Sequence, residues 1–435
     1  MLTKNISFKN FSGVKIKKSI FVKKTFFDKN KLIQNYPLLK SFFKDYNYSY
    51  KKNDLKKFKK YRNIRIIGMG GSILGIEAIY QFLKHKVKKK LFFLNNLRPY
   101  IENKKKALNI VISKSGETLE TISNFHILHK GKKNKKNLFF LNNLRPYIKN
   151  KKKALNIVIS KSGETLETIS NFHILHKRKK NQKNVFITEK SNNYINILAH
   201  QLKDNVFEHK NYIGGRYSVL SEVGMLPAEL MGLNEKKFKQ LNYLIKNKIF
   251  INNLISNVKS TIGLIKKKKF NSIILNYDEN SDNFFRWYQQ LIAESLGKKS
   301  KGIVPLISTM PKDNHSLLQL YLDGPRVNFF TFFNVKNDKT EKVSNKISQR
   351  SKMYLKNKNL SQIIDAQRIA TERIFLIKKL PFRSFTVLKR SEESMGELFC
   401  FFVLETILLG KVLKINPFDQ PSVELIKVET KKILT

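Results

Sequence analysis

Short apolar runs that end in glycine- or serine-rich turns alternate with helical patterns along most of this chain. The clearest unit begins at Ile64–Gly68, passes through the turn Gly68-Met69-Gly70-Gly71-Ser72 and continues into a helical pattern at Ile73–Lys84. A second unit leads from the apolar segment 108–112 through Ser113-Lys114-Ser115-Gly116 into another helical pattern. Alternating strands and helices of this length are typical of parallel sheets. The chain is therefore expected to be an α/β protein with two doubly wound parallel-sheet domains and a helical C-terminal segment.

The same alternation continues after residue 200, and it suggests four regions. We expect a basic, helical N-terminal extension over 1–60, a first α/β domain over 61–210, a second over 211–410 and a helical segment over 411–435. Further strands are expected at 91–95, 185–188, 272–276, 327–333 and 384–388, and helices at 238–265, 283–296, 360–375, 395–409 and 422–433.

One segment of the first domain occurs twice. Residues 91–130 and 138–177 are identical except for Glu102 and Lys149, at an offset of 138 − 91 = 47 residues. Solenoid repeats drift in sequence and need several copies to bury a core. Two near-identical copies indicate a recent tandem duplication, or an error in the source sequence, and one copy is surplus to the fold.

Only one copy of the serine-rich turn can lie beside Gly68–Ser72, because the sheet has one neighbouring position there. The first copy follows the first helix directly, and the second leads directly into the strand at 185–188. Both connections are short, so loop length does not discriminate between them. We favour the first copy in the core, since its strands follow the glycine-rich unit without a detour.

The charge balance allows two interpretations. Lysine and arginine total 85 and aspartate and glutamate 32, which gives a net charge of +53. Such a charge can attract polyanions. The lysines are scattered, however, and residues encoded by A/T-rich codons are frequent, so codon bias explains the charge without a specific nucleic-acid partner. With a single cysteine, Cys400, and no apolar run long enough for a signal or a membrane span, we expect a cytoplasmic protein without disulfides.

Two turns have the composition of phosphate-binding sites. Gly68–Ser72 offers free amides, close backbone approach and a hydroxyl at a helix start. The serine-rich turn offers hydroxyls and a lysine after a strand. Either turn alone could be an ordinary tight turn, but consecutive strand ends of one parallel sheet are where ligands bind. The candidate phosphate ligands are Gly71, Ser72 and, from the two copies, Ser113, Lys114, Ser115 and Thr118 or Ser160, Lys161, Ser162 and Thr165.

Four further residues could carry acid–base chemistry. Arg216, in Gly214-Gly215-Arg216-Tyr217-Ser218, is either a surface arginine at a hinge or a cation aimed at a developing oxyanion. Glu294 shares a helix face with Trp287 and Gln290 and is either a surface carboxylate or a general base. His315 lies in a polar turn, where a surface or capping role is the alternative. Lys427 is one of many lysines, and its position alone indicates little.

Taken in order, these motifs resemble the glucose-6-phosphate isomerase family over roughly residues 60–432. The most specific block is Gly214–Ser218 with Ser221 to Pro227. It is followed by Gln289-Gln290-Leu291 to Glu294-Ser295, by His315-Ser316 with Gln319-Leu320, and by Asp419-Gln420 to Glu424 with Lys427.

The resemblance implies an aldose–ketose isomerase that interconverts glucose 6-phosphate and fructose 6-phosphate without a metal or cofactor. It implies that the serine and threonine hydroxyls hold the phosphate with Gln420, and that His315, helped by Lys427, opens the sugar ring. It also implies that Glu294 moves the proton through a cis-enediol and that Arg216 stabilises the enediolate. In the family the histidine comes from a partner subunit, so a homodimer is implied.

Several features depart from the family. Glu117 and its equivalent Glu164 place a carboxylate in the phosphate loop, which is tolerable only if it points away from the ligand.

A second enzyme class, a glucosamine-phosphate synthase fragment, is disfavoured by the sequence. It would need an N-terminal cysteine, and residue 2 is Leu2. An inactive or relaxed-specificity sugar-phosphate binder, with a cradle disturbed by the duplication, remains the alternative.

Overall fold

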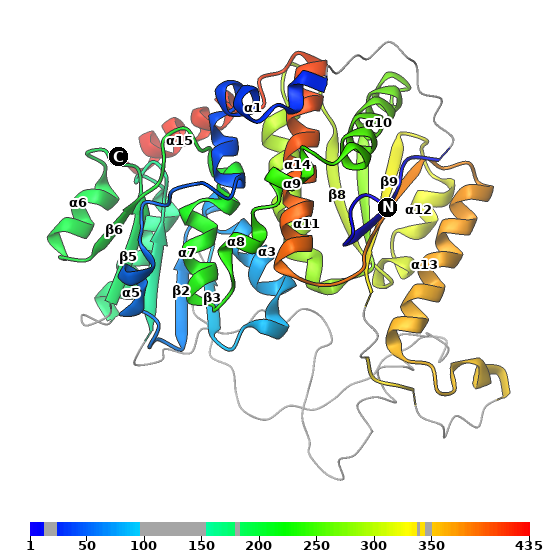
Figure 1. The fold of residues 1–435 in the computed structure, drawn as a ribbon, viewed down its shortest axis with the longest axis horizontal. Coiled ribbons are helices and arrows are strands. Elements are labelled where there is room, and N and C mark those ends of the chain that lie inside the picture. Colours follow the sequence, from blue (N-terminus) through cyan, green and yellow to red (C-terminus); the bar gives the residue numbers. More distant parts are fainter. Residues whose placement is uncertain (13–23, 96–153, 179–182, 337–339, 344–349) are drawn as a thin grey trace, which may run out of the picture.

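The computed structural model describes the chain except for residues 13–23, 96–153, 179–182, 337–339 and 344–349. In the described part, two five-stranded sheets stand on either side of a central layer of helices (Figure 1). The predicted α/β class with parallel sheets is confirmed, while the four domain boundaries stay predictions.

The first sheet is entirely parallel, with the strand order β3-β2-β4-β5-β6. Its strands are β2 (Asn63–Ile67), β3 (Lys90–Leu94), β4 (Leu155–Ile159), β5 (Lys183–Thr188) and β6 (Asn205–Glu208). The central strand β4 is buried throughout, as expected for an apolar strand covered on both faces.

The second sheet has the order β1-β10-β9-β7-β8, and only β1 runs antiparallel to its neighbour. Its strands are β1 (Ile6–Lys9), β7 (Asn271–Asn276), β8 (Val304–Thr309), β9 (Asn328–Val335) and β10 (Phe382–Val387). Strands β7, β9 and β10 confirm the expected positions.

The described α-helices are α1 (Lys29–Asn35), α2 (Lys52–Lys56), α3 (Leu74–Phe82), α5 (Leu166–Arg178), α6 (Tyr194–Gln201), α7 (Glu222–Leu230), α8 (Glu235–Phe238), α9 (Leu241–Leu244), α10 (Lys248–Lys266), α11 (Asp282–Leu296), α12 (Leu318–Asp323), α13 (Leu360–Ile377), α14 (Glu392–Leu413) and α15 (Pro421–Leu434). The described 3₁₀ turns are η1 (Lys24–Phe27), η2 (Pro37–Phe42), η3 (Gly70–Ser72), η4 (Lys84–Lys86), η5 (Gly215–Leu220), η6 (Glu279–Ser281), η7 (Lys312–His315) and η8 (Arg350–Leu355).

Helix α14 lies between the two sheets and is buried along almost its whole length (Figure 1). Its apolar run was expected to form a buried helix, and this is confirmed. A helix that is apolar on all sides needs partners on all sides. Helix α11 packs against it, with the ring of Trp287 at a centroid distance of 4.7 Å from Phe399. The helical core between the two sheets therefore includes α11, the helix that bears Glu294.

The N-terminal extension, which was expected to be helical, contains a strand as well as helices. Residues 6–9 form β1, the edge strand of the second sheet, which pairs with β10 in the register Ile6↔Val387. Ile6 and Phe8 are buried while Lys9 is exposed, so the two apolar side chains on one face drive the pairing. The expected helix over 238–265 is also broken, because Asn247 caps a new helix at Lys248 with its side chain.

The expectation that the first copy occupies the core is wrong as well. The sheet takes β3 from the first copy and takes β4, the serine-rich turn and α5 from the second. Strand β2 pairs with both, in the registers Ile64↔Leu91 and Ile64↔Leu155. The core is therefore a hybrid of the two copies.

Candidate active site

Two glycine-rich turns from different parts of the chain meet at the centre of the site. A Cβ atom on Gly71 would lie 2.1 Å from the carbonyl carbon of Gly215, so only glycine allows this approach. The hydroxyl of Ser218 donates to the carbonyl oxygens of Gly71 (3.3 Å) and Gly215 (2.7 Å). The turn after β2 and the Gly-Gly-Arg-Tyr-Ser turn are thereby fixed against each other.

Arg216 is buried beside this junction, with 3% of its surface exposed. Its Nε donates to Ser295 Oγ (2.9 Å), and Nη1 donates to Glu294 Oε2 (3.1 Å) and Gln420 Oε1 (2.7 Å). Nη2 donates to the carbonyl oxygens of Pro417 (2.7 Å) and Asp419 (2.9 Å). A guanidinium has five N–H groups, so each one has a protein acceptor. Arg216 is a fixed cation rather than a surface arginine.

Glu294 is held from two sides. One carboxylate oxygen accepts from Arg216, and the other accepts from Nε2 of Gln290 at 2.8 Å. Gln290 and Glu294 are four residues apart on α11 and thus share a helix face. The Glu294 side chain is 27% exposed, so it is partly buried but accessible to a ligand. Trp287, which was expected on the same face, donates its indole N–H to the carbonyl oxygen of Arg216 at 3.1 Å.

The serine-rich turn of the second copy lies beside the turn after β2. A Cβ atom on Gly68 would lie 3.0 Å from the carbonyl oxygen of Ile159, the last residue of β4. Within the turn, Ser160 Oγ is 2.9 Å from Thr165 Oγ1 and accepts the N–H of Gly163 at 3.1 Å. The juxtaposition of two strand-end turns that was predicted for phosphate binding is present, with Ser160, Ser162 and Thr165 in it. Ser113, Lys114, Ser115 and Thr118 lie outside the described residues.

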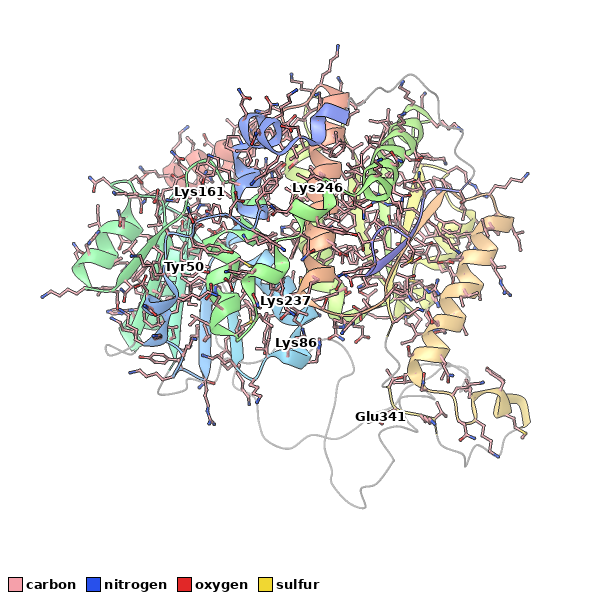
Figure 2. The ribbon with its side chains drawn as sticks, viewed as in Figure 1. Tyr50, Lys86, Lys161, Lys237, Lys246 and Glu341 are labelled. Atoms are coloured by element: carbon pink, nitrogen blue, oxygen red, sulfur yellow. The ribbon has the colours of Figure 1, made fainter. Side chains whose placement is uncertain are left out.

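Lys161, which was predicted to be a phosphate ligand, has protein partners in the structure. Its Nζ donates to the carbonyl oxygen of Asn211 (2.9 Å) and forms an ion pair with Glu189 (3.3 Å). The lysine thus ties the serine-rich turn to the segments after β5 and β6. Figure 2 places Lys161 far from Lys86 and Lys237, in keeping with the scattered distribution of lysines in the sequence.

The remaining predicted residues lie on three separate segments. Gln420 reaches the site through Arg216. Lys427 is exposed on α15, and His315 is exposed in η7. The hydrogen-bond partners given above for Arg216 and Glu294 include neither His315 nor Lys427.

Sequence reasoning assigned no role to several residues that support Arg216. The hydroxyl of Tyr217 donates to the carbonyl oxygen of Pro417 (2.9 Å) and lies 2.8 Å from Ser295 Oγ. Lys298 Nζ donates to the carbonyl oxygens of Asn416 and Asp419, at 2.6 Å each. It also donates to the carboxylate of Asp419, and this hydrogen bond lowers the pKa of Asp419. Two cations therefore anchor residues 416–420. The sequence offered one indication of a role for Tyr217 and Ser295, because these residues directly follow Arg216 and Glu294.

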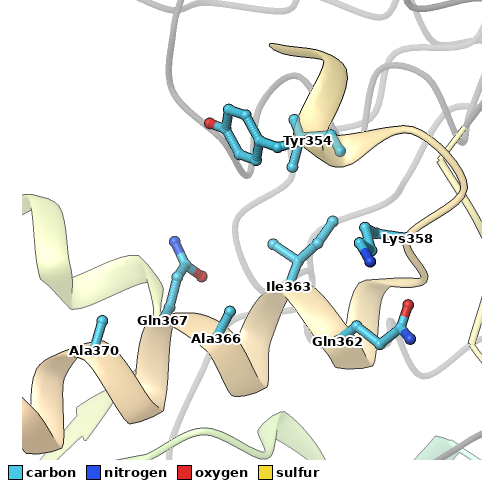
Figure 3. A pocket seen from close by; sticks show the side chains of 8 residues that line it. Tyr354, Lys358, Gln362, Ile363, Ala366, Gln367 and Ala370 are labelled. Atoms are coloured by element: carbon cyan, nitrogen blue, oxygen red, sulfur yellow. The ribbon is translucent and has the colours of Figure 1, made fainter. Parts of the chain in front are cut away.

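Two cavities formed by described residues lie outside the site around Arg216 and Glu294. One of about 410 Å³ is lined by α13 and the segment around Tyr354 (Figure 3). The other, of about 460 Å³, is formed by residues 189–191 and 208–212 at the carboxyl ends of β5 and β6. Neither contains Arg216 or Glu294. Among the described residues, no helix has the length and apolar character needed to cross a membrane.

Comparison with known proteins agrees with this geometry. Residues 132–435 match the family described as phosphoglucose isomerase, a range that contains the second copy of the repeat. The chain is 31% identical to a probable glucose-6-phosphate isomerase of Methanococcus maripaludis, covering 87% of this chain and 80% of that protein. It is 30% identical to glucose-6-phosphate isomerase of Methanocaldococcus jannaschii, covering 90% and 88%.

The fold has a solved counterpart. A glucose-6-phosphate isomerase from Chlamydia trachomatis superimposes with a TM-score of 0.64 at 18% identity, over 98% of this chain and 80% of that one. The fold of this chain thus occurs in that solved structure as well. Because the family match covers more than half of the chain and includes Arg216, Glu294 and the second-copy turn, the chain belongs to the phosphoglucose isomerase family.

Proposed function

We propose that this chain interconverts glucose 6-phosphate and fructose 6-phosphate through a cis-enediol. The observation that carries the proposal is the ion pair between Arg216 and Glu294, which lies beside two adjacent strand-end turns. The turns suit a phosphate group, and the carboxylate is an accessible base next to a permanent cation.

The phosphate would be held by Gly71 and Ser72 together with the second-copy residues Ser160, Ser162 and Thr165. Backbone amides and hydroxyls at helix starts favour a dianion. Gln420 is a further candidate ligand. Its amide oxygen now accepts from Arg216, which leaves its amide nitrogen to donate.

Glu294 would take the proton from C2 of the open-chain aldose and return it to C1 on the same face. The charge that develops on the enediolate oxygen would be stabilised by Arg216. All five guanidinium N–H groups already have protein acceptors, so this stabilisation would come from a fixed, desolvated charge.

Ring opening would be carried out by His315 with help from Lys427. An imidazole suits this step because its ordinary pKa of about 6.5 allows proton transfer in both directions near neutral pH. His315 lies in η7, whereas Glu294 lies on α11. We propose that His315 of the partner subunit completes each site in a cytoplasmic homodimer.

The test is Glu294→Gln, which keeps the size of the side chain and removes the base. We expect kcat to fall by about a hundredfold to ten-thousandfold with little change in sugar-phosphate affinity. Glu279→Gln is the matched control, because Glu279 is an exposed carboxylate just before the other end of α11. A Glu294→Gln variant that keeps more than a tenth of the wild-type kcat would reject the assignment.

A further inference from the structure

The serine-rich turn carries a carboxylate whose orientation the structure resolves. Glu164 lies between Gly163 and Thr165, where a charge facing the phosphate would oppose binding. In the structure its Oε1 accepts the backbone N–H of Tyr194, the first residue of α6, at 2.8 Å. The carboxylate is therefore directed at the start of α6.

The start of a helix is a favourable place for this charge. The first N–H groups of a helix lack partners within the helix, and the helix dipole attracts anions there. Asn193 caps α6 by accepting the N–H of Asn196 at 2.9 Å. Glu164 accepts a different one, that of Tyr194, so the two side chains share the capping of α6.

Further contacts join the turn to the segment between β5 and α6. The carbonyl oxygen of Gly163 accepts the N–H of Ile195 at 3.2 Å, and that of Lys161 accepts the N–H of Glu189 at 3.1 Å. Gly163 has a φ of +71°, and a Cβ atom there would lie 1.8 Å from Asn193 Oδ1. The turn thus packs closely against the start of α6.

Glu164 connects the start of α6 to the hydroxyl groups of the turn. Its own N–H donates to Ser162 Oγ at 3.3 Å, while its side chain is fixed on α6. On either side, Ser160 and Thr165 are held to each other by their hydroxyl groups. Loss of the Glu164 carboxylate would release the turn from α6 at the residue between these hydroxyls.

We propose that Glu164 is a positioning residue for phosphate binding, which holds the Ser160–Thr165 turn on α6 and keeps its own charge away from the ligand. This inference rests on the proposed function, because it assumes that the turn binds the substrate phosphate. It predicts the direction in which the affinity for phosphate changes when the carboxylate is removed. Removing a carboxylate that repels the phosphate would tighten binding, whereas removing one that positions the turn weakens it.

The experiment compares Glu164→Ala, Glu164→Gln and Glu117→Ala in the full-length protein. Glu117 is the same residue of the first copy, so Glu117→Ala makes the same chemical change outside the described turn. Glu167→Ala, which removes a charge from the first turn of α5, controls for local electrostatics. The measured quantities are kcat and KM for glucose 6-phosphate and the Kd for inorganic phosphate, determined by a binding method independent of turnover.

We expect Glu164→Ala to raise KM and the phosphate Kd about three- to tenfold, with kcat changed less than twofold, because one charge-assisted hydrogen bond is lost. Glu164→Gln keeps an oxygen acceptor for Tyr194 and should stay within about twofold of the wild type, as should both control variants. A role limited to general stability would not separate KM from kcat in this way.

Unchanged or tighter phosphate binding by Glu164→Ala would overturn the inference. So would a Glu164→Gln variant as weak as Glu164→Ala, since the hydrogen bond would then not be what matters. If the wild type binds inorganic phosphate but does not isomerise glucose 6-phosphate, the proposed function fails, and the Kd values still decide the role of Glu164.

Discussion

Arg216 gathers residues from two other parts of the chain around one side chain. Its acceptors are Glu294 and Ser295 on α11 and three residues of the segment 417–420 before α15. A lysine has three N–H donors on a flexible stem and cannot reproduce this fork. The planar guanidinium is therefore what allows one residue both to fix the base and to anchor residues 416–420.

His209 is a buried residue outside this site whose protonation affects stability. It is 1% exposed, and burial lowers its pKa to about 4. Above pH 6.5 the imidazole is neutral in both the folded and the unfolded chain. Between pH 6.5 and 4 the unfolded chain binds a proton that the folded chain excludes, so the free energy of unfolding falls as the pH falls.

We therefore predict that His209→Phe reduces the loss of stability between pH 7.5 and 4.5. The expected difference from the wild type is on the order of 2 kcal/mol. Urea unfolding at the two pH values measures it, and His200→Gln, at an exposed position of α6, is the control. Equal acid sensitivity of the wild type and His209→Phe would show that His209 does not carry this effect.

At the scale of elements, the N-terminal segment 41–50 holds the turn that carries Arg216. The hydroxyl of Tyr46 donates to both carboxylate oxygens of Glu222 at 3.0 Å, and Lys239 Nζ donates to the carbonyl oxygens of Ser41 and Leu220. Burial lowers the pKa of Lys239 to about 7. A buried lysine is tolerated here because carbonyl groups and Glu222 surround it.

The hybrid sheet predicts different roles for the two serine-rich turns. We predict that Ser160→Ala/Thr165→Ala raises KM at least tenfold, since two hydroxyls near a dianion are lost. Ser113→Ala/Thr118→Ala, the identical change in the first copy, should leave KM unchanged. Steady-state kinetics of the two double variants decides the matter, and equal effects from both would contradict the assignment of the site to the second copy.

At the scale of the whole molecule, we expect the surplus unit to lower stability. Deleting residues 91–137 leaves one unit, in which Leu138–Leu141 replace the identical residues of β3. The β3–β4 connection then shortens by 47 residues (138 − 91). We predict that the free energy of unfolding rises by about 1 kcal/mol or more, because closing the shorter loop costs less entropy.

Urea unfolding of the deletion variant measures this gain, and its kcat and KM should match those of the full chain. A deletion variant that is less stable, or that loses activity, would mean that the extra unit contributes contacts of its own.

Local sequence determined much of this protein. The alternation of strands and helices, the turn at Gly68–Ser72 and the buried helix α14 are all fixed by short-range pattern, because the spacing of apolar residues sets which face is buried. The family motifs also singled out Arg216 and Glu294, which the structure brings into contact.

Tertiary structure decided what identical or weak local signals could not. Two copies of one sequence have equal local propensity, so nothing within either copy could indicate which one supplies β4 and the turn that follows it. Strand β1 became a strand only by pairing with the edge of β10, hundreds of residues away. Lys161 and Glu164 contact neighbouring segments because the carbonyl oxygen of Asn211 and the start of α6 supply their partners. Such long-range partners leave no trace in the spacing of nearby residues.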